Sequence, residues 1–402
     1  MDEPNPANGV AECLALTPAL SGSRPGRAPV APRSRLYLRC VPLSGLYNIP
    51  LGRARIASPP ALDDPLALFS VPEKRRIEMK YTQLGRSGLV VSRICLGCMT
   101  YGTPKWRPWV LDEVDSRPFF RKALDLGVNF FDTADMYSMG VSEEVTGRAL
   151  REMANMEEIV LATKVHFPMG DGPNMGGISR KHIVQACEAS LRRLGVETID
   201  LYQIHRFKSS VPIEETLGAL DHLVSQGKVR HIGASSGYAW QMARALSVSE
   251  SQGWARFISM QNHYNLVYRE EEREMIPLCI EEGIGVIPWS PLARGRLART
   301  TPSPSSGTTR ADTDNYAVDL YDSPSDLLVV EAVRKVASAL GVAPSEVALA
   351  WLLQRPGVTG PIVGATKIEH LESAVRSLDV SLTDEQVHSL EEPYLPHAVK
   401  GH

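Results

Sequence analysis

Short apolar runs alternate with amphipathic segments from residue 79 onward. The short runs are rich in β-branched and aromatic residues, which is typical of buried strands. Eight of them can be counted: RICLG, VNFFDTA, IVLATKV, IDLYQIH, VRHIGASS, FISMQNHY, IGVIPWS and GPIVGA. The segments between them have apolar positions at helical spacing and often end at glycine, as in RPFFRKALDLG, RKHIVQACEASLRRLG, PIEETLGALDHLVSQG and REEEREMIPLCIEEG. These segments predict helices.

Eight strand and helix units predict a single α/β domain, a (β/α)8 TIM barrel spanning residues 79–402. An open doubly wound sheet shows the same alternation and is the structural alternative. It is disfavoured because no strand is followed by GxGxxG and the chain contains no GxxxxGK[ST] segment. The number of units also matches the closure of a barrel.

Residues 1–78 differ from the rest of the chain. They are rich in proline, carry arginines without acidic residues between Cys13 and Leu62, and show no sustained period of 2 or 3.6. We expect a disordered N-terminal extension, with ordered sequence beginning at Met79 in MKYTQLG. The arginine-rich composition also fits an organellar transit peptide, and a start codon placed too far upstream is equally compatible.

Composition narrows the class of protein. The chain has 402 residues, 43% of them hydrophobic, and a formal charge of −3, so it is not biased toward nucleic acid or an anionic membrane. No apolar run reaches the roughly 18 residues that span a bilayer, and no basic segment precedes the N-terminal apolar patch. We therefore expect a cytoplasmic protein. The close cysteine pair in CLGC has no second pair or nearby histidines, which predicts free thiols and no metal site.

Polar residues at the ends of three predicted strands indicate an active site. The active site of a (β/α)8 barrel lies at the carboxyl ends of its strands. Asp132 ends the second strand, Lys164 lies near the end of the third, and His205 ends the fourth, while Tyr137 follows in the loop after Asp132. A phenol with a reference pKa near ~10 can donate a proton at neutral pH if an ammonium group stabilises its phenolate. Lys164 would supply that charge, and Asp132 would hold Lys164 in place.

Each of these residues also has a structural interpretation. Asp132 could cap the helix predicted over SEEVTGRALRE, and Tyr137 could be a partly buried residue at the rim of the barrel. Lys164 could extend to solvent, and an isolated His205 could be a structural histidine. The four residues together favour catalysis, because a lysine or histidine at the end of an apolar strand is unfavourable without a partner.

From Met79 to about His397 the chain resembles the aldo-keto reductases, whose Asp, Tyr, Lys and His tetrad falls on the four residues above. Several motifs carry the resemblance: NFFDTADMYSMGVSEEVTGRAL, IHRF, IGASS, WSPLARGRL and PIVGATKIEHLE. The phrases LGCMTYG, QNHYNLVYREEEREM and EEPYLPH are most similar to the bacterial and fungal branch with xylulose-producing and aryl-alcohol-dehydrogenase-like members.

The resemblance implies NADPH as the cofactor, bound across the barrel mouth without a Rossmann domain. Ser235 and Gln261 would hold the nicotinamide carboxamide, and Trp289 would stack on its ring. The remaining contacts would come from Ser290, Pro291, Leu292 and Arg296 at the pyrophosphate and from Gly364, Thr366, Lys367 and His370 at the adenosine phosphate. Where many members have Arg, Glu and Asn in the last cofactor segment, this chain has His370, Ser373 and Ala374.

The reaction implied is reduction of an aldehyde or ketone by hydride transfer, with Tyr137 protonating the oxygen and His205 orienting it. The substrate would be an aryl aldehyde or a small sugar-like carbonyl. A rim around it would be formed by Met99, Trp106, Trp109, Arg206 and Phe207, or these residues would simply cover the barrel top. We expect no nucleic-acid or membrane partner, and the surface helices indicate no clear interface.

Two other functions use the same fold. Potassium-channel β subunits bind nicotinamide cofactors as regulatory partners, but they have asparagine at the position of His205. A metal-dependent sugar isomerase would need clustered carboxylate and histidine ligands at the strand ends, and the sequence lacks them there.

Overall fold

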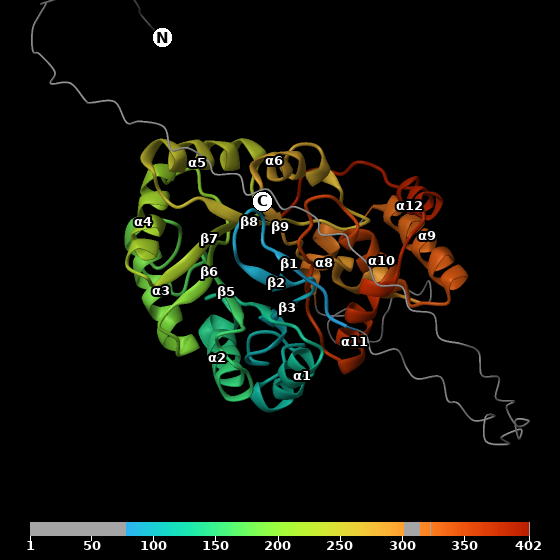
Figure 1. Cartoon of the computed structure of the whole chain (residues 1–402), viewed down its shortest axis with the longest axis horizontal. Coiled ribbons are helices and arrows are strands. Elements are labelled where there is room, and N and C mark those ends of the chain that lie inside the picture. Colours follow the sequence, from blue (N-terminus) through green and yellow to red (C-terminus); the bar gives the residue numbers. More distant parts are fainter. Residues whose placement is uncertain (1–77, 301–313, 322, 402) are drawn as a thin grey trace, which may run out of the picture. The chain divides into compact units, whose positions relative to one another are not determined.

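A computed structural model describes residues 78–300, 314–321 and 323–401. The expected N-terminal extension therefore lies outside the described residues, apart from Glu78. In the described part, a ring of parallel strands is surrounded by helices, and a short hairpin crosses the centre of the ring (Figure 1). The predicted α/β barrel is confirmed.

The eight predicted strands all form, in one parallel sheet of order β10-β3-β4-β5-β6-β7-β8-β9. Their bounds are β3 (Cys95–Gly97), β4 (Phe130–Asp132), β5 (Val160–Val165), β6 (Ile199–Ile204), β7 (Val229–Ser235), β8 (Phe257–Gln261), β9 (Gly285–Val286) and β10 (Ile362–Val363). Their length and apolar character suit a sheet that is covered on both faces.

Backbone hydrogen bonds between the two edges of the sheet close the ring. The N–H of Ile362 donates to the carbonyl of Pro288 at 2.9 Å, and the N–H of Thr359 donates to the carbonyl of Val286 at 2.8 Å. A parallel bridge also joins Val286 to Val358. An open doubly wound sheet would leave these edges unpaired, so that alternative is excluded.

An antiparallel hairpin that the pattern did not predict precedes the barrel, formed by β1 (Tyr81–Gln83) and β2 (Val90–Ser92). Leu84 and Val91 are fully buried in one apolar cluster with Phe130 and Leu201 of the barrel interior. The N–H of Arg86 donates to the carbonyl of Gly283, which lies just before β9. The hairpin therefore covers the end of the barrel at which the strands begin.

The helices lie outside the ring (Figure 1). Their bounds are α1 (Glu113–Asp125), α2 (Val141–Met153), α3 (Arg180–Leu194), α4 (Ile213–Ser225), α5 (Ala239–Gln252), α6 (Met275–Glu282), α8 (Asn315–Leu320), α9 (Pro324–Leu340), α10 (Pro344–Leu353), α11 (Ile368–Arg376) and α12 (Asp384–Glu391). The helices predicted over RKHIVQACEASLRRLG and SEEVTGRALRE are α3 and α2.

The helix predicted over residues 269–283 is correct only from Met275 onward. A short 3₁₀ turn, Glu270–Glu272, comes first. The carboxylate of Glu270 accepts hydrogen bonds from the Tyr394 hydroxyl at 2.6 Å and from the backbone N–H of His397 at 2.8 Å. These bonds to the C-terminal segment hold the turn and override the local helical pattern.

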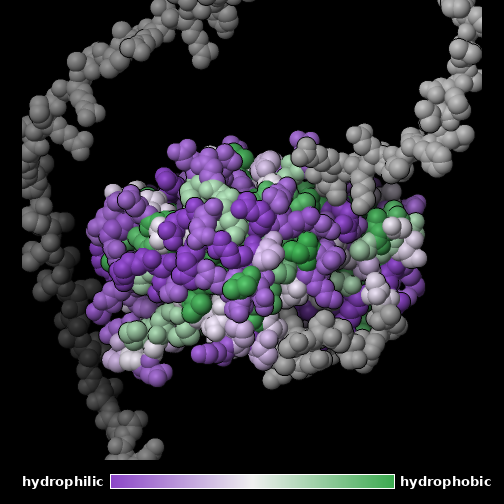
Figure 2. Space-filling view, turned by 90° about the horizontal axis from the view of Figure 1, so that it is seen from below, coloured by the Kyte–Doolittle hydropathy of each residue, from purple (hydrophilic) through white to green (hydrophobic). Residues whose placement is uncertain are grey.

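On the face shown in Figure 2 hydrophilic side chains predominate, and the apolar residues occur in small groups. No single helix in the described ranges is long and apolar enough to cross a membrane. Helices α9 and α10 reach that length and hydropathy only as a pair, and they are bent by 100°.

Backbone strain gathers on the side of the barrel where the strands end. All the non-glycine residues with positive φ in the described chain lie in loops that follow strand ends: Ser138, Met139, Asn174, Ser236, Ser290, Ala293 and Arg294. Such residues are uncommon and persist where the surrounding structure holds them in place. Three of these loops carry residues of the candidate site.

Gly147 sets how closely α2 approaches α3. A Cβ at this position would lie 2.1 Å from the carbonyl oxygen of Leu194. We predict that Gly147→Ala lowers the free energy of unfolding by about 1–3 kcal/mol, because the clash outweighs the better helix propensity of alanine. Urea denaturation measures this. Gly88→Ala is the control, since a Cβ there meets nothing within 4 Å. An equal, small change in both variants would contradict the packing assignment.

Candidate active site

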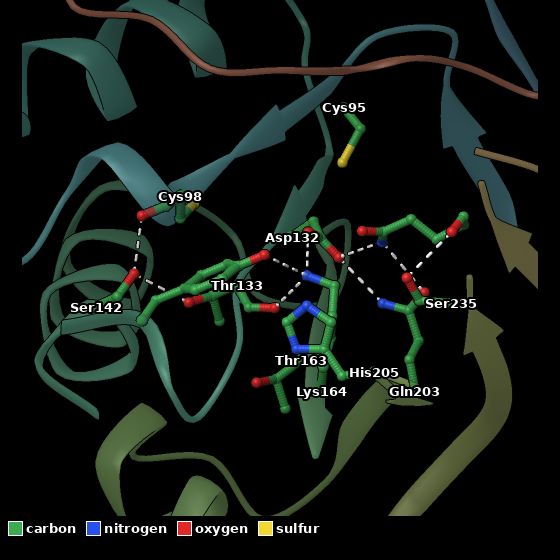
Figure 3. Close-up of polar contacts among 12 residues, drawn as sticks. Cys95, Cys98, Asp132, Thr133, Ser142, Thr163, Lys164, Gln203, His205 and Ser235 are labelled. Carbon is green, nitrogen blue, oxygen red and sulfur yellow. Dashed lines mark hydrogen bonds and ion pairs between the residues drawn. The ribbon is translucent and has the colours of Figure 1, made fainter. Parts of the chain in front are cut away.

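Four polar residues from neighbouring segments lie in contact at the end of the barrel where the strands end, and Figure 3 labels three of them, Asp132, Lys164 and His205. Asp132 is the last residue of β4, Lys164 lies in β5, and His205 directly follows β6. Tyr137 lies in the turn Tyr137–Gly140 that leads into α2. The structure therefore brings together all four residues of the predicted tetrad, which are separated by up to 73 positions in the sequence.

The ammonium group of Lys164 is fully buried and uses all three of its donors. It donates to the Asp132 carboxylate at 2.5 Å, to the Thr133 carbonyl at 2.8 Å and to the Tyr137 hydroxyl oxygen at 3.3 Å. A buried ammonium is tolerable only when its charge and its donors are matched in this way. Lys164 does not extend to solvent.

Asp132 is held by groups from three further strands. Besides Lys164, its carboxylate accepts hydrogen bonds from the side-chain amides of Gln203 and Gln261, each at 3.0 Å. Helix α2 begins after Gly140, and no side chain caps it. Asp132 therefore does not act as a helix cap, and its position is explained by the buried ion pair.

The charges around Lys164 favour a protonated phenol and a charged amine. Burial raises the pKa of Tyr137 above its usual value, and the positive charge of Lys164 opposes that rise. Burial alone would lower the pKa of Lys164, but Asp132 and Tyr137 outweigh it, so the pKa is raised. At neutral pH the pair is therefore a neutral phenol beside an ammonium ion.

His205 is a neutral imidazole beside the phenol. Burial lowers its pKa well below the usual value, and the positive charges of Lys164 and Arg206 lower it further. Its ring contacts the rings of Tyr137 and Phe167 edge to face, with ring centroids 5.8 Å and 4.9 Å away. A neutral imidazole carries one N–H, which can donate a hydrogen bond to an oxygen atom in the cavity.

A cavity of about 1550 Å³ opens above these residues. All five residues predicted for the substrate rim line it, namely Met99, Trp106, Trp109, Arg206 and Phe207. Trp106 approaches Tyr137 with ring centroids 6.2 Å apart, so aromatic surface begins directly beside the phenol.

The residues predicted for the nicotinamide lie on the wall of the same cavity. The Trp289 ring stacks on the His263 ring with centroids 4.3 Å apart, and the indole N–H donates to the Ser236 hydroxyl at 2.9 Å. The Ser235 hydroxyl donates to the backbone carbonyl of Gln261 at 3.0 Å. These contacts fix the orientation of the indole ring and of both polar residues.

Most residues predicted for the cofactor phosphates also line the cavity: Ser290, Pro291, Leu292, Gly364, Thr366, Lys367 and His370. Arg296 does not, and its guanidinium lies 5.7 Å from the ring of Tyr321. Arg294 and Arg299, from the same segment, do line the cavity. Of the substituted positions, Ser373 hydrogen-bonds with Ser345 at 2.8 Å and Ala374 is buried.

Sequence reasoning missed several residues of the site. Gln203 is a polar residue in the apolar run IDLYQIH, on the same strand face as the barrel-interior Leu201, and that alternation is a signal for an inward-facing amide. Phe167, two residues after β5, and Arg294 have no comparable signal in the sequence, because loop geometry places them.

In the described ranges no three His, Cys, Asp or Glu residues are grouped so that they could hold a metal ion. Cys95, Cys98, Cys187 and Cys279 are buried free thiols, as the isolated CLGC motif predicted. Burial raises the pKa of Cys98 to about 12, so it is a thiol at neutral pH.

Comparison with known proteins identifies relatives over nearly all of the described chain. A family model described as "Aldo/keto reductase family" matches residues 93–394. A versiconal hemiacetal acetate reductase of Aspergillus parasiticus is 43% identical over 342 residues, which cover 80% of this chain and 98% of that protein. Aldo-keto reductases of Alternaria alternata and Metarhizium robertsii are 42% and 41% identical, covering 80% and 81% of this chain and 93% and 94% of theirs.

Asp135, two residues before Tyr137, is another fully buried carboxyl group. Burial raises its pKa to about 8, and the negative charge of Glu143 adds to the rise. The Glu143 carboxylate itself binds Arg193 at 2.6 Å and the Thr163 hydroxyl at 2.6 Å. Asp135 is therefore protonated in the folded protein at neutral pH.

This gives a prediction for stability against pH. An unfolded chain releases the Asp135 proton near pH ~4, so between pH 4 and 8 only the folded state holds it, and stability falls as pH rises through that window. Asp135→Asn has no such proton. We predict that the free energy of unfolding of the wild type falls relative to the variant by about 1 kcal/mol or more between pH 5 and 8. A constant difference in urea denaturation at both values would contradict this.

Proposed function

Since the chain belongs to the aldo/keto reductase family, we propose that it is an NADPH-dependent oxidoreductase that reduces an aldehyde or ketone to an alcohol, with Tyr137 as the proton donor. The observation that carries the proposal is the set of three hydrogen bonds from the buried Lys164. One of them ends on the phenol oxygen of Tyr137, which lines the cavity.

Lys164 prepares Tyr137 to act as an acid. The ammonium donates to the phenol oxygen, so this hydrogen bond does not use the hydroxyl proton of Tyr137. That proton can therefore be donated to a substrate. When the proton moves to a carbonyl oxygen, a phenolate remains 3.3 Å from a positive charge that Asp132 keeps in place. That charge stabilises the phenolate in a buried site where electrostatic interactions are strong.

His205 supports the same transfer. As a neutral imidazole beside Tyr137 it can donate its N–H to the carbonyl oxygen while the phenol approaches. Two donors on one oxygen fix the orientation of the carbonyl and stabilise the negative charge that develops on it. An imidazolium at this position would add a third positive charge beside Lys164 and Arg206, and the low pKa prevents this.

The donors along the cavity fit a dinucleotide with phosphate groups. Lys367, Arg294 and Arg299 supply positive charge on the segments that follow β10 and β9, and Trp289 supplies an aromatic face near the tetrad. Ser235 and Gln261 would hold the carboxamide, and Lys367 would bind a 2′-phosphate, which favours NADPH over NADH. NADPH bound by these residues would supply the hydride for the reduction of the carbonyl group.

The cavity favours an aryl carbonyl over a sugar. Trp106, Phe167 and Trp289 present aromatic rings around the tetrad, and such rings bind flat apolar groups. The relative named as a versiconal hemiacetal acetate reductase supports a reductase activity. Aryl aldehydes are therefore the first substrates to test.

Removing the Tyr137 hydroxyl tests the proposal. We predict that Tyr137→Phe lowers kcat for reduction of benzaldehydes with NADPH by on the order of 10²-fold or more, because the proton donor is lost while the ring keeps its packing. Turnover is followed by NADPH absorbance, and cofactor affinity by fluorescence titration.

Tyr202→Phe is the matched control, since Tyr202 is a buried tyrosine on β6 whose hydroxyl reaches the Ile183 carbonyl outside the barrel mouth. It should retain kcat within about twofold, and both variants should bind NADPH. Near-wild-type reduction by a folded Tyr137→Phe enzyme would overturn the role of Tyr137. Absence of any aldehyde reduction by the wild type would overturn the proposed function.

A further inference from the structure

We propose that the preferred substrates are aryl carbonyl compounds that also carry a carboxylate, and that Arg206 binds this anionic group. The inference rests on the proposed function, carbonyl reduction at Tyr137, and adds the charge of the substrate to it. It follows from the unequal distribution of charge in the cavity.

The cavity wall is strongly basic. Among its described residues are five cations, Arg107, Arg206, Arg294, Arg299 and Lys367. Asp132 is the single carboxylate among the described residues of this wall, and its oxygens are already bound by Lys164 and two glutamine amides. A cavity with this balance attracts anionic ligands.

Three of the five cations belong to the segments proposed for the cofactor. Lys367 follows β10, while Arg294 and Arg299 lie in the segment after β9. Arg294 also has an ion pair with Asp314 at 3.2 Å. Phosphate groups at these segments would account for positive charge there, but they do not account for a cation at the tetrad.

Arg206 is the cavity arginine that lies beside the tetrad. It directly follows His205, and its charge helps to lower the pKa of that histidine. Its guanidinium carbon lies 5.9 Å from the centre of the Phe167 ring and 6.0 Å from that of Trp289. An anion bound by Arg206 would therefore be part of a molecule whose carbonyl is within reach of Tyr137 and His205.

Arg206 is partly buried and has no counter-charge among the described residues. It donates to the backbone carbonyl of His205 at 2.5 Å and interacts with the hydroxyl of Tyr316. In the described part of the chain no carboxylate forms an ion pair with it. Burial lowers its pKa, and the groups that oppose this are the phenols Tyr316 and Tyr137.

A guanidinium has five N–H donors, so several remain for a ligand. Its planar fork matches a carboxylate in a two-bond arrangement. Because no carboxylate in the described ranges pairs with this largely desolvated guanidinium, an incoming carboxylate would supply its counter-charge. The flanking rings of Phe167 and Trp289 would enclose an aromatic body that carries it.

An anionic substrate and its neutral ester, compared in the wild type and in variants of Arg206, test the inference. The probes are 4-formylbenzoate and its methyl ester, reduced by the full chain with saturating NADPH. We expect kcat/KM of the wild type to be at least about tenfold higher for the carboxylate. In Arg206→Gln the ratio of the two values should fall to between about one and three, and in Arg206→Lys it should stay nearer the wild-type ratio.

Lys208→Gln is the control, because Lys208 is an exposed cation two residues away, and it should keep the ratio. Equal kcat/KM for the two compounds in the wild type would overturn the inference and leave the proposed function intact. If folded Arg206→Gln keeps the wild-type ratio of kcat/KM for the carboxylate to that for the ester, the assignment to Arg206 is overturned. Loss of this ratio in Arg107→Gln instead would also overturn it. Failure of the wild type to reduce either compound would overturn the proposed function and this inference with it.

Discussion

A buried lysine ammonium needs a counter-charge and three hydrogen-bond acceptors, and the arrangement of this site follows from meeting that need. Lys164 finds its counter-charge in Asp132 on the neighbouring strand and its other acceptors in Thr133 and Tyr137. The Asp132 carboxylate must then be satisfied in turn, and Gln203 and Gln261 do so from β6 and β8. One ion pair thus links strands around the barrel and defines the place of the phenol.

The two ends of the barrel differ in structure: one is closed by apolar packing, and the other carries the loops of the candidate site. At one end the hairpin buries Leu84 and Val91 in the apolar interior, which excludes water from beneath the ion pair. At the other end the loops adopt conformations that non-glycine residues rarely use, including Ser138 beside Tyr137 and Ser290 beside Trp289. Strain of this kind needs a rigid scaffold to hold it, and the closed ring of parallel strands provides one.

Much of this could be predicted from the sequence, because it depends on local patterns. Alternating apolar runs located every strand of the barrel, and the strand-end rule brought Asp132, Lys164 and His205 to one mouth. The hairpin was missed because β1, with the sequence YTQ, contains no apolar run, and both of its strands gain stability only by packing into the barrel. The place of Arg296 beside Tyr321, away from the cavity, depends on loop geometry that the periodicity of a sequence does not encode.

Whether Lys164 acts on the reaction through Tyr137 can be measured with a double-mutant cycle. The rate constant for a single turnover of a benzaldehyde with bound NADPH is compared among the wild type, Tyr137→Phe, Lys164→Met and the double variant, with thermal unfolding showing that each is folded. If the two residues act as a unit, the double variant should be slower than Tyr137→Phe by no more than about threefold. Rate losses that multiply in the double variant would show that Lys164 acts independently of the phenol and would contradict the proposed role of this hydrogen bond.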